Sequence, residues 1–179
     1  MSQGNPDIRQ QVDASRGPLK KLQLLIPGLR GYRKLEDIRV SDEMLRNQTA
    51  DKIDGARQNL EQLRKLVAAS NDFTNLSSVG SLASQLQALS GEVRHAQQGY
   101  SGWVAPIAIN EEKLNKLYEY DYAFVSSVMD LATATGKIVY DPSVPNSIQT
   151  AIGQISRTIG DIRQKWSTRM EAIEGIALG

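Results

Sequence analysis

Apolar side chains recur every three or four residues along most of this chain of 179 residues, which is the spacing of one face of an α-helix. Four stretches carry the pattern and predict long helices at about 35–69, 75–98, 111–135 and 144–176. The most regular seam, in the last stretch, consists of Ile148, Ile152, Ile155, Ile159, Ile162, Trp166, Met170, Ile173 and Ile176. We therefore expect an all-α protein, an elongated up-down four-helix bundle with a short N-terminal amphipathic helix.

A short helix is predicted ahead of the bundle. Residues 1–17 are polar and predict a flexible tail, whereas Pro18 suits the first position of a helix that Pro27 and Gly28 end. The segment 18–34 is an amphipathic arm and corner, and residues 1–40 carry eight Lys and Arg against four Asp and Glu. The residues predicted to contact a partner or a membrane are Leu19, Lys20, Lys21, Leu22, Leu25, Arg30, Tyr32, Arg33 and Lys34.

Three roles remain open for this arm from its sequence. Its aliphatic face can cap the bundle, dock a protein partner, or lie in an anionic membrane surface. A second apolar segment, with Trp103, Val104, Ile107 and Ile109, connects the second and third helices, and we expect it to cover one end of the bundle.

Acidic residues interrupt two of the apolar seams. Asp121 falls between Leu117 and Phe124, and Asp42 interrupts the seam of the first long helix. Because a buried carboxylate needs a partner to offset its desolvation, we expect each to pair with an Arg or a Tyr hydroxyl and to set helix register. A ligand or proton site is the alternative for Asp121.

Charge and composition exclude several classes of function. The 21 Lys and Arg against 20 Asp and Glu give a net charge of +1, which offers no general attraction for nucleic acid. Cysteine is absent, so disulfides and thiolate metal sites are excluded. No apolar run reaches the length of a signal segment or a membrane span, so a cytoplasmic location is expected.

Catalytic and metal-binding residues are hard to assemble from this sequence. Glu92 and His95 have the Glu-x-x-His spacing of carboxylate-bridged metal bundles, but His95 is the single histidine, so a full site would require two chains. An ordinary surface histidine is the alternative. A carboxylate-only acid and base pair remains open near Tyr118–Tyr122. We predict no catalytic residue, no metal and no cofactor.

Two glycines in the last helix predict a second interface. Gly153 and Gly160 lie seven residues apart beside the isoleucine seam, and each is unfavourable in a helix relative to alanine. Close packing would explain them, either within the bundle or between chains. Small residues in the second helix, namely Gly80, Ser84, Ala88 and Gly91, are the expected counterpart.

The junction between the arm and the first long helix carries a motif. The run from Pro27 to Arg39, followed by Ser41, Asp42 and Arg46, has the pattern P-G-x-x-G-Y and then Glu, Arg, Asp and Arg at helical spacing. Over about 30 residues it resembles the opening of a prokaryotic family of uncharacterised helical proteins. Physically, Glu36, Arg39, Asp42 and Arg46 can form an ion-pair ladder or a docking face.

These features favour a non-enzymatic interaction or scaffolding bundle that self-associates and contacts a protein partner through the arm. A peripheral membrane protein using the same arm is the second hypothesis. The third is a carboxylate-based metal or small-molecule enzyme in the bundle core.

Overall fold

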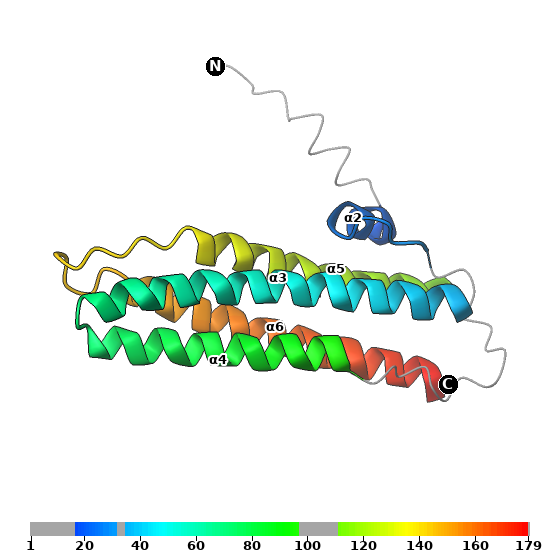
Figure 1. The fold of residues 1–179 in the computed structure, drawn as a ribbon. Helices are drawn as coiled ribbons and strands as arrows, with labels where there is room; N and C mark the ends of the chain where they lie inside the picture. The colour runs from blue at the N-terminus through cyan, green and yellow to red at the C-terminus, as the bar shows by residue number, and fades with distance from the viewer. Residues whose placement is uncertain (1–16, 32–34, 97–110, 179) are drawn as a thin grey trace, which may run out of the picture.

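Five helices account for nearly all of the described chain in a computed structural model, which describes residues 17–31, 35–96 and 111–178. The described residues are all-helical and contain no strand. The helices are α2 (Pro18–Leu25), α3 (Leu35–Ala69), α4 (Phe73–His95), α5 (Glu111–Gly136) and α6 (Gln149–Leu178) (Figure 1). The predicted tail 1–16, the corner 32–34 and the apolar connection 97–110 lie outside the described residues.

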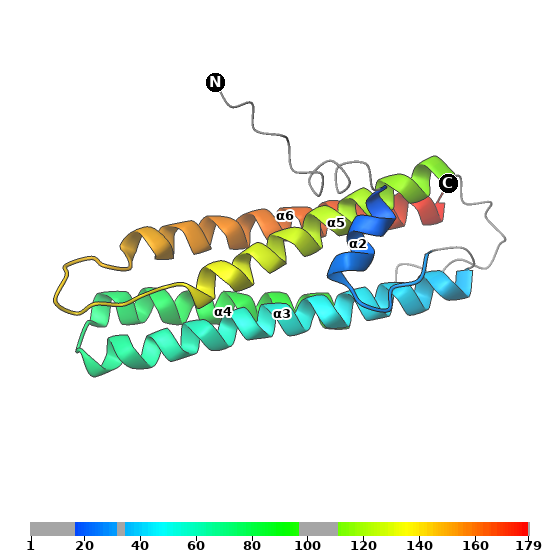
Figure 2. The ribbon, with the colours of Figure 1, turned by 90° about the horizontal axis from the view of Figure 1, so that it is seen from above.

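The four long helices lie side by side, and consecutive ones run in opposite directions (Figures 1 and 2). In cross-section they form a square, because α3 contacts α4 and α5 while α6 contacts the same two helices. The α3–α4 turn and the α5–α6 connection meet at one end, which we call the loop end. Helix α6 ends at the opposite end of the bundle, where α3 and α5 begin (Figures 1 and 2).

The predicted seams form the core. Leu45, Ile53, Leu86, Val128 and Ile159 are among many seam residues with almost no exposed surface. Phe124 of α5 and Trp166 of α6 pack with ring centroids 5.1 Å apart. Because burial of each large aliphatic side chain contributes on the order of 1.5–3 kcal/mol, the continuous seam supplies most of the force that holds the helices together.

Two predicted helix starts were wrong. We expected α4 to begin near 75, but it begins at Phe73, because Asp72 is the cap, and its carboxylate accepts a hydrogen bond from the Asn75 backbone N–H at 3.1 Å. We expected α6 to begin near 144, but it begins at Gln149. Pro145 disfavours the helical conformation at the residue before it, and Asn146 has a positive φ of 58°. Ser143 instead donates its N–H and hydroxyl to Asp141.

The cap of α4 predicts a pH-dependent contribution to stability. The Asn75 side-chain amide, the Asn75 N–H and the Tyr140 hydroxyl donate to the Asp72 carboxylate and lower its pKa below 3.8. A lowered folded pKa gives stability that is fully present above the unfolded pKa and is lost as pH falls through the folded pKa. Asp72→Asn should therefore lower the melting temperature at pH 6, and the difference from wild type should close as pH falls below 3.8. Melting curves followed by circular dichroism measure this difference, and a difference independent of pH contradicts it.

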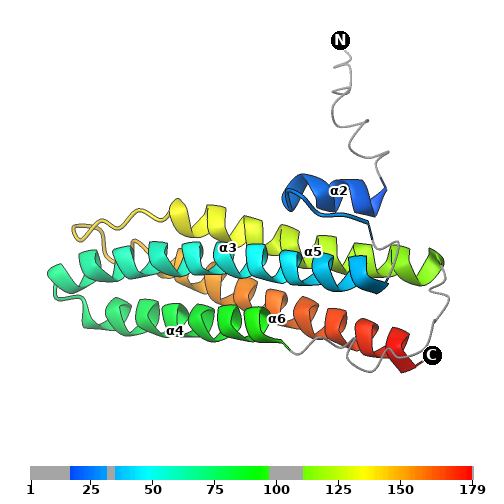
Figure 3. The same cartoon turned by 45° about the vertical axis from the view of Figure 1, so that its right-hand side comes forward.

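Helix α2 lies outside the square of long helices and crosses α5 (Figures 2 and 3). The segment that follows it runs along α3: Ser41 donates its hydroxyl to the Arg30 carbonyl at 2.9 Å, and Gln48 donates its amide to the Pro27 carbonyl at 3.0 Å. Gly28 has a φ of +84°, a conformation that other residues rarely adopt, and it turns the chain between α2 and this segment.

Candidate functional site

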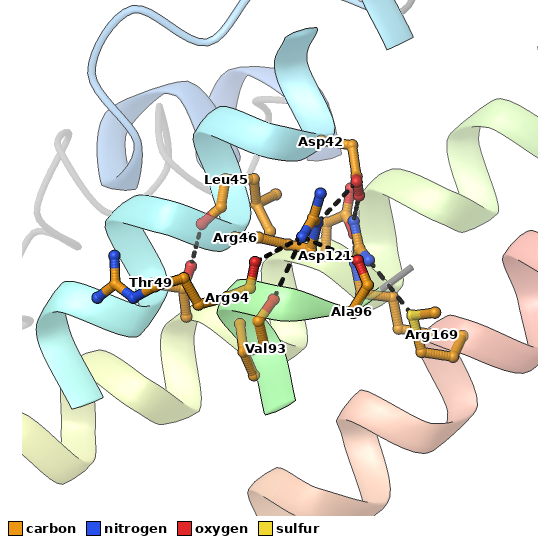
Figure 4. Close-up of polar contacts among 10 residues, drawn as sticks. Asp42, Leu45, Arg46, Thr49, Val93, Arg94, Ala96, Asp121 and Arg169 are labelled. Carbon is orange, nitrogen blue, oxygen red and sulfur yellow. Dashed lines mark hydrogen bonds and ion pairs between the residues drawn. The ribbon is translucent and has the colours of Figure 1, made fainter. Parts of the chain in front are cut away.

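Four charged residues are buried together in the half of the bundle away from the loop end. Asp42 and Arg46 belong to α3, Asp121 to α5 and Arg169 to α6 (Figure 4). Arg169 and Asp121 have no exposed surface, and Asp42 and Arg46 have almost none. We call these four residues the charge cluster. Buried charges of this kind are rare in proteins unless they are paired.

Each carboxylate of the charge cluster accepts hydrogen bonds from a guanidinium group. Arg169 donates its Nε–H to Asp121 Oδ1 and its Nη2–H to Asp42 Oδ1, both at 2.5 Å. Arg46 donates its Nε–H to Asp42 Oδ2 at 2.8 Å. The bond between Arg169 and Asp42 crosses the diagonal of the square and so joins α3 to α6, which are not neighbours along its sides. Two positive and two negative groups leave the cluster formally neutral.

Arg46 also holds the end of α4. Its Nη1 donates to the carbonyls of Arg94 at 2.9 Å and Ala96 at 3.2 Å, and it lies 3.5 Å from the carbonyl of Val93 (Figure 4). The last carbonyls of a helix lack partners within the helix and form the negative end of its dipole. The Arg46 guanidinium group donates hydrogen bonds to these carbonyls and places a positive charge at the negative end of the dipole. Because Arg46 thereby reaches α4, the cluster connects all four long helices.

Aromatic and thioether groups surround the rest of Arg169. Its guanidinium carbon lies 5.3 Å from the ring centroid of Trp166, one turn earlier in α6, and Nη1 lies 3.9 Å from Met170 Sδ. Cation–π contacts strengthen when water is excluded. The cluster is thus a packed part of the core in which both carboxylates are engaged by arginine.

The sequence predicted half of this cluster. Asp42 and Asp121 were expected to be buried and paired, and that prediction is confirmed. Arg169 was missed, although the seam of α6 carried a signal for it. From Ile148 to Trp166 the seam alternates steps of four and three, and the next step of three from Trp166 is Arg169 rather than Met170. Met170 was expected in the seam because it is apolar.

Arg46 was expected either in an ion-pair ladder along the first long helix or in a docking face, and one pair of that ladder is present. The bond to Asp42 exists, but both side chains point into the core and not to solvent. The side chains of the other two ladder residues, Glu36 and Arg39, lie outside the described residues.

The arm packs on the bundle with its aliphatic face. Leu22 and Ile26 are completely buried, and Leu19 and Leu25 pack partly against the core. The prediction that Leu22 contacts a partner or a membrane was therefore wrong, because the bundle already covers the apolar face of the arm. Lys20, Leu24 and Arg30 remain exposed, and Lys21 is half-buried. Tyr32, Arg33 and Lys34 lie outside the described residues.

Gly153 and Gly160 do not pack within the bundle. Both are exposed, and a Cβ atom at either position would meet nothing within 4 Å. The intramolecular form of the predicted second interface is therefore wrong, since the isoleucine seam turns this side of α6 outward. Contact between chains through these glycines stays a prediction.

The described residues do not bring Glu92 and His95 together with further metal ligands. Glu92 accepts from Arg163 Nη1 at 3.2 Å, and His95 is exposed. Within the described ranges, no group of three or more His, Asp or Glu side chains is placed to hold a metal ion.

A serine and a lysine do meet: Lys165 Nζ lies 2.5 Å from Ser127 Oγ and 2.7 Å from Asp161 Oδ2. A serine nucleophile also needs amide donors for an oxyanion, and in the interior of helices these amides bond to carbonyls of the preceding turn. We therefore assign this pair a structural role between α5 and α6.

Known proteins add no family to this description. Comparison of the chain with protein-family models, curated proteins and solved structures finds no match. Among the described helices, none has an apolar stretch sufficient to cross a membrane. The resemblance of the P-G-x-x-G-Y segment to a prokaryotic helical family stays a prediction.

Proposed function

We propose that this protein is a non-enzymatic, cytoplasmic interaction bundle that self-associates and contacts a protein partner. The proposal takes its fold to be an elongated up-down four-helix bundle with an amphipathic helix docked on its side. Such a bundle is rigid along its length and can present binding surfaces at fixed separation.

The observation that carries this proposal is the placement of exposed apolar side chains. The large exposed ones lie mostly toward the two ends of the bundle: Leu24 and Val40 with the arm, and Leu66, Phe73, Val139 and Val144 at the loop end. Exposed apolar groups that gather in patches mark surfaces for other proteins more often than single ones do. Meanwhile the core carboxylates and arginines bind one another, which favours a structural role for the interior.

The outward face of α2 supports the partner contact. Leu24 is 63% exposed, and Lys20, one turn earlier on the same face of the helix, is also exposed. Arg30 follows in the segment that runs along α3 and is exposed as well. An apolar side chain with basic neighbours suits a partner whose surface is apolar with an acidic rim.

A membrane role would require more rearrangement. The arm would have to leave α5 to offer Leu22 and Ile26 to a bilayer, and both side chains would give up their buried positions. An enzyme built on the core carboxylates would likewise require Asp42 and Asp121 to exchange arginine for a substrate or metal. Neither rearrangement is needed for the interaction bundle.

Leu24→Asp is the substitution that tests the arm. Immobilised wild-type protein should retain a specific partner from cell extract, and Leu24→Asp should reduce its recovery at least about tenfold, because truncation or charge at a central contact commonly has such effects. Leu66→Asp is the matched control, since Leu66 is 58% exposed but lies in the last turn of α3, near the loop end.

The oligomeric state is measured separately by light scattering across a wide range of concentration. Wild-type protein that stays monomeric and retains no partner would contradict the proposal. Equal recovery by Leu24→Asp and wild type would remove the arm from it.

A further inference from the structure

The loop end carries the most exposed apolar side chains among the described residues. Val139 in the α5–α6 connection is 79% exposed, and Phe73 at the start of α4 is 72% exposed. The two connections that hold them lie side by side (Figures 1 and 2), and the Tyr140 hydroxyl donates to Asp72 Oδ2 at 3.4 Å, which joins them. Two large apolar groups thus face solvent from neighbouring segments.

Residues 137–141 alternate between inward and outward positions. Ile138 and Tyr140 are half-buried and pack against the core, whereas Lys137, Val139 and Asp141 are exposed. A period of two places alternate side chains on opposite sides of an extended segment. Lys137, Val139 and Asp141 therefore share one outward side, with the apolar residue in the middle and opposite charges on either side.

This arrangement is complementary to itself. A two-fold axis through Val139, perpendicular to the segment, reverses the direction of a second copy. Lys137 of one copy then meets Asp141 of the partner subunit, Asp141 meets Lys137 of the partner subunit, and the two valines meet at the axis. Isologous contacts have this reciprocal form. Asp141 carries its charge at neutral pH, because hydrogen bonds from Ser143 lower its pKa.

We propose that the outward side of Lys137–Asp141, together with Phe73, is the contact between two copies of this chain, related by a two-fold axis at Val139. The inference rests on the self-association in the proposed function and names its surface. A second copy is the occupant because the charge order is inverted about the central valine, so that each copy supplies what the other requires. The surface is separate from the outward face of α2, which stays available to a protein partner.

The absence of cysteine allows a direct test of the axis. In Val139→Cys the two thiols meet at the axis, within the roughly 3.5–4.5 Å between Cβ atoms that a disulfide requires. In Lys137→Cys each thiol lies two residues from the axis, so the pair is separated by about 13 Å along extended chains that rise about 3.3 Å per residue. Exposed Ser167→Cys on α6 is the control for random collision.

Under mild oxidation, Val139→Cys should form a covalent dimer at least about tenfold faster than Lys137→Cys or Ser167→Cys. Charge reversal in Lys137→Glu should weaken self-association in light scattering more than Lys137→Gln does, because it opposes Asp141 of the partner subunit with a like charge. Slow cross-linking of Val139→Cys in a wild-type background that self-associates overturns the axis and leaves the proposed function standing. Slow cross-linking together with a monomeric wild type overturns both.

Discussion

Asp121→Leu is expected to lower the free energy of unfolding by about 3–5 kcal/mol, which is the usual cost of removing one partner from a buried ion pair. The substitution changes the formal charge of the charge cluster from zero to +1 in a place without solvent. Arg169 keeps its bond to Asp42 but loses its bond to Asp121, and the charge cluster then contains one carboxylate for two arginines. Urea unfolding followed by circular dichroism measures the loss.

Asp130→Leu is the matched control for that experiment. Asp130 lies on the same helix but is exposed, and exposed substitutions away from special features change stability by about 0.5 kcal/mol or less. A loss of similar size in both variants would show that leucine in α5 is unfavourable in itself. Equal stability of Asp121→Leu and wild type would contradict the role assigned to the charge cluster.

Arg169→Met is expected to have a comparable effect of about 3–5 kcal/mol with the opposite charge. Asp42 and Asp121 would remain with Arg46 as their only guanidinium within the cluster, at a formal charge of −1. The bond across the diagonal of the square would disappear, and the contact with the Trp166 ring would lose its cation. Methionine fills most of the same volume, so that the loss reports on charge more than on a cavity.

Arg169→Lys separates charge from geometry in the same experiment. A lysine keeps the positive charge but has no planar fork to reach two carboxylates on different helices. We expect its stability to fall between wild type and Arg169→Met. Stability of Arg169→Met at the wild-type level would contradict this view of the cluster.

Much of the fold could be predicted from local pattern. Seams of three and four steps fixed the four long helices to within a few residues, because burial of an apolar face dominates helix placement. The starts of α4 and α6 were misplaced because they depend on single capping and turn residues rather than on the apolar pattern. Asp72 caps α4 and starts it at Phe73 rather than near 75, and Pro145 with the turn at Asn146 keeps 144–148 out of α6.

The charge cluster was only half visible because its arrangement is tertiary. A single acidic residue within a seam signals a buried partner, but it does not say which helix supplies the partner. Arg169 is 48 residues from Asp121 and 127 from Asp42. Arg46 lies beside the seam rather than on it, and its use as a cap for α4 depends on how α3 and α4 are placed.

The surfaces were the least predictable part. The sequence left three roles open for the aliphatic side of the arm, and in the structure that side contacts the bundle whereas Leu24 faces solvent. The sequence shows that a helix is amphipathic, but it does not show whether the bundle, a partner or a membrane covers its apolar face. Val139 belongs to a short connection and Phe73 to the first turn of α4, where no long periodicity singles out either residue.

Both proposed surfaces depend on the packing of four helices whose core contains a formally neutral charge cluster. The double variant Asp121→Leu with Arg169→Met tests this dependence most directly, because it removes one charge of each sign and leaves Asp42 bonded to Arg46. Urea unfolding of the two single variants and the double variant forms a thermodynamic cycle. We predict that the double variant is more stable than either single variant. Losses that simply add, to a total of about 6–10 kcal/mol from two losses of about 3–5 kcal/mol each, would contradict a neutral cluster.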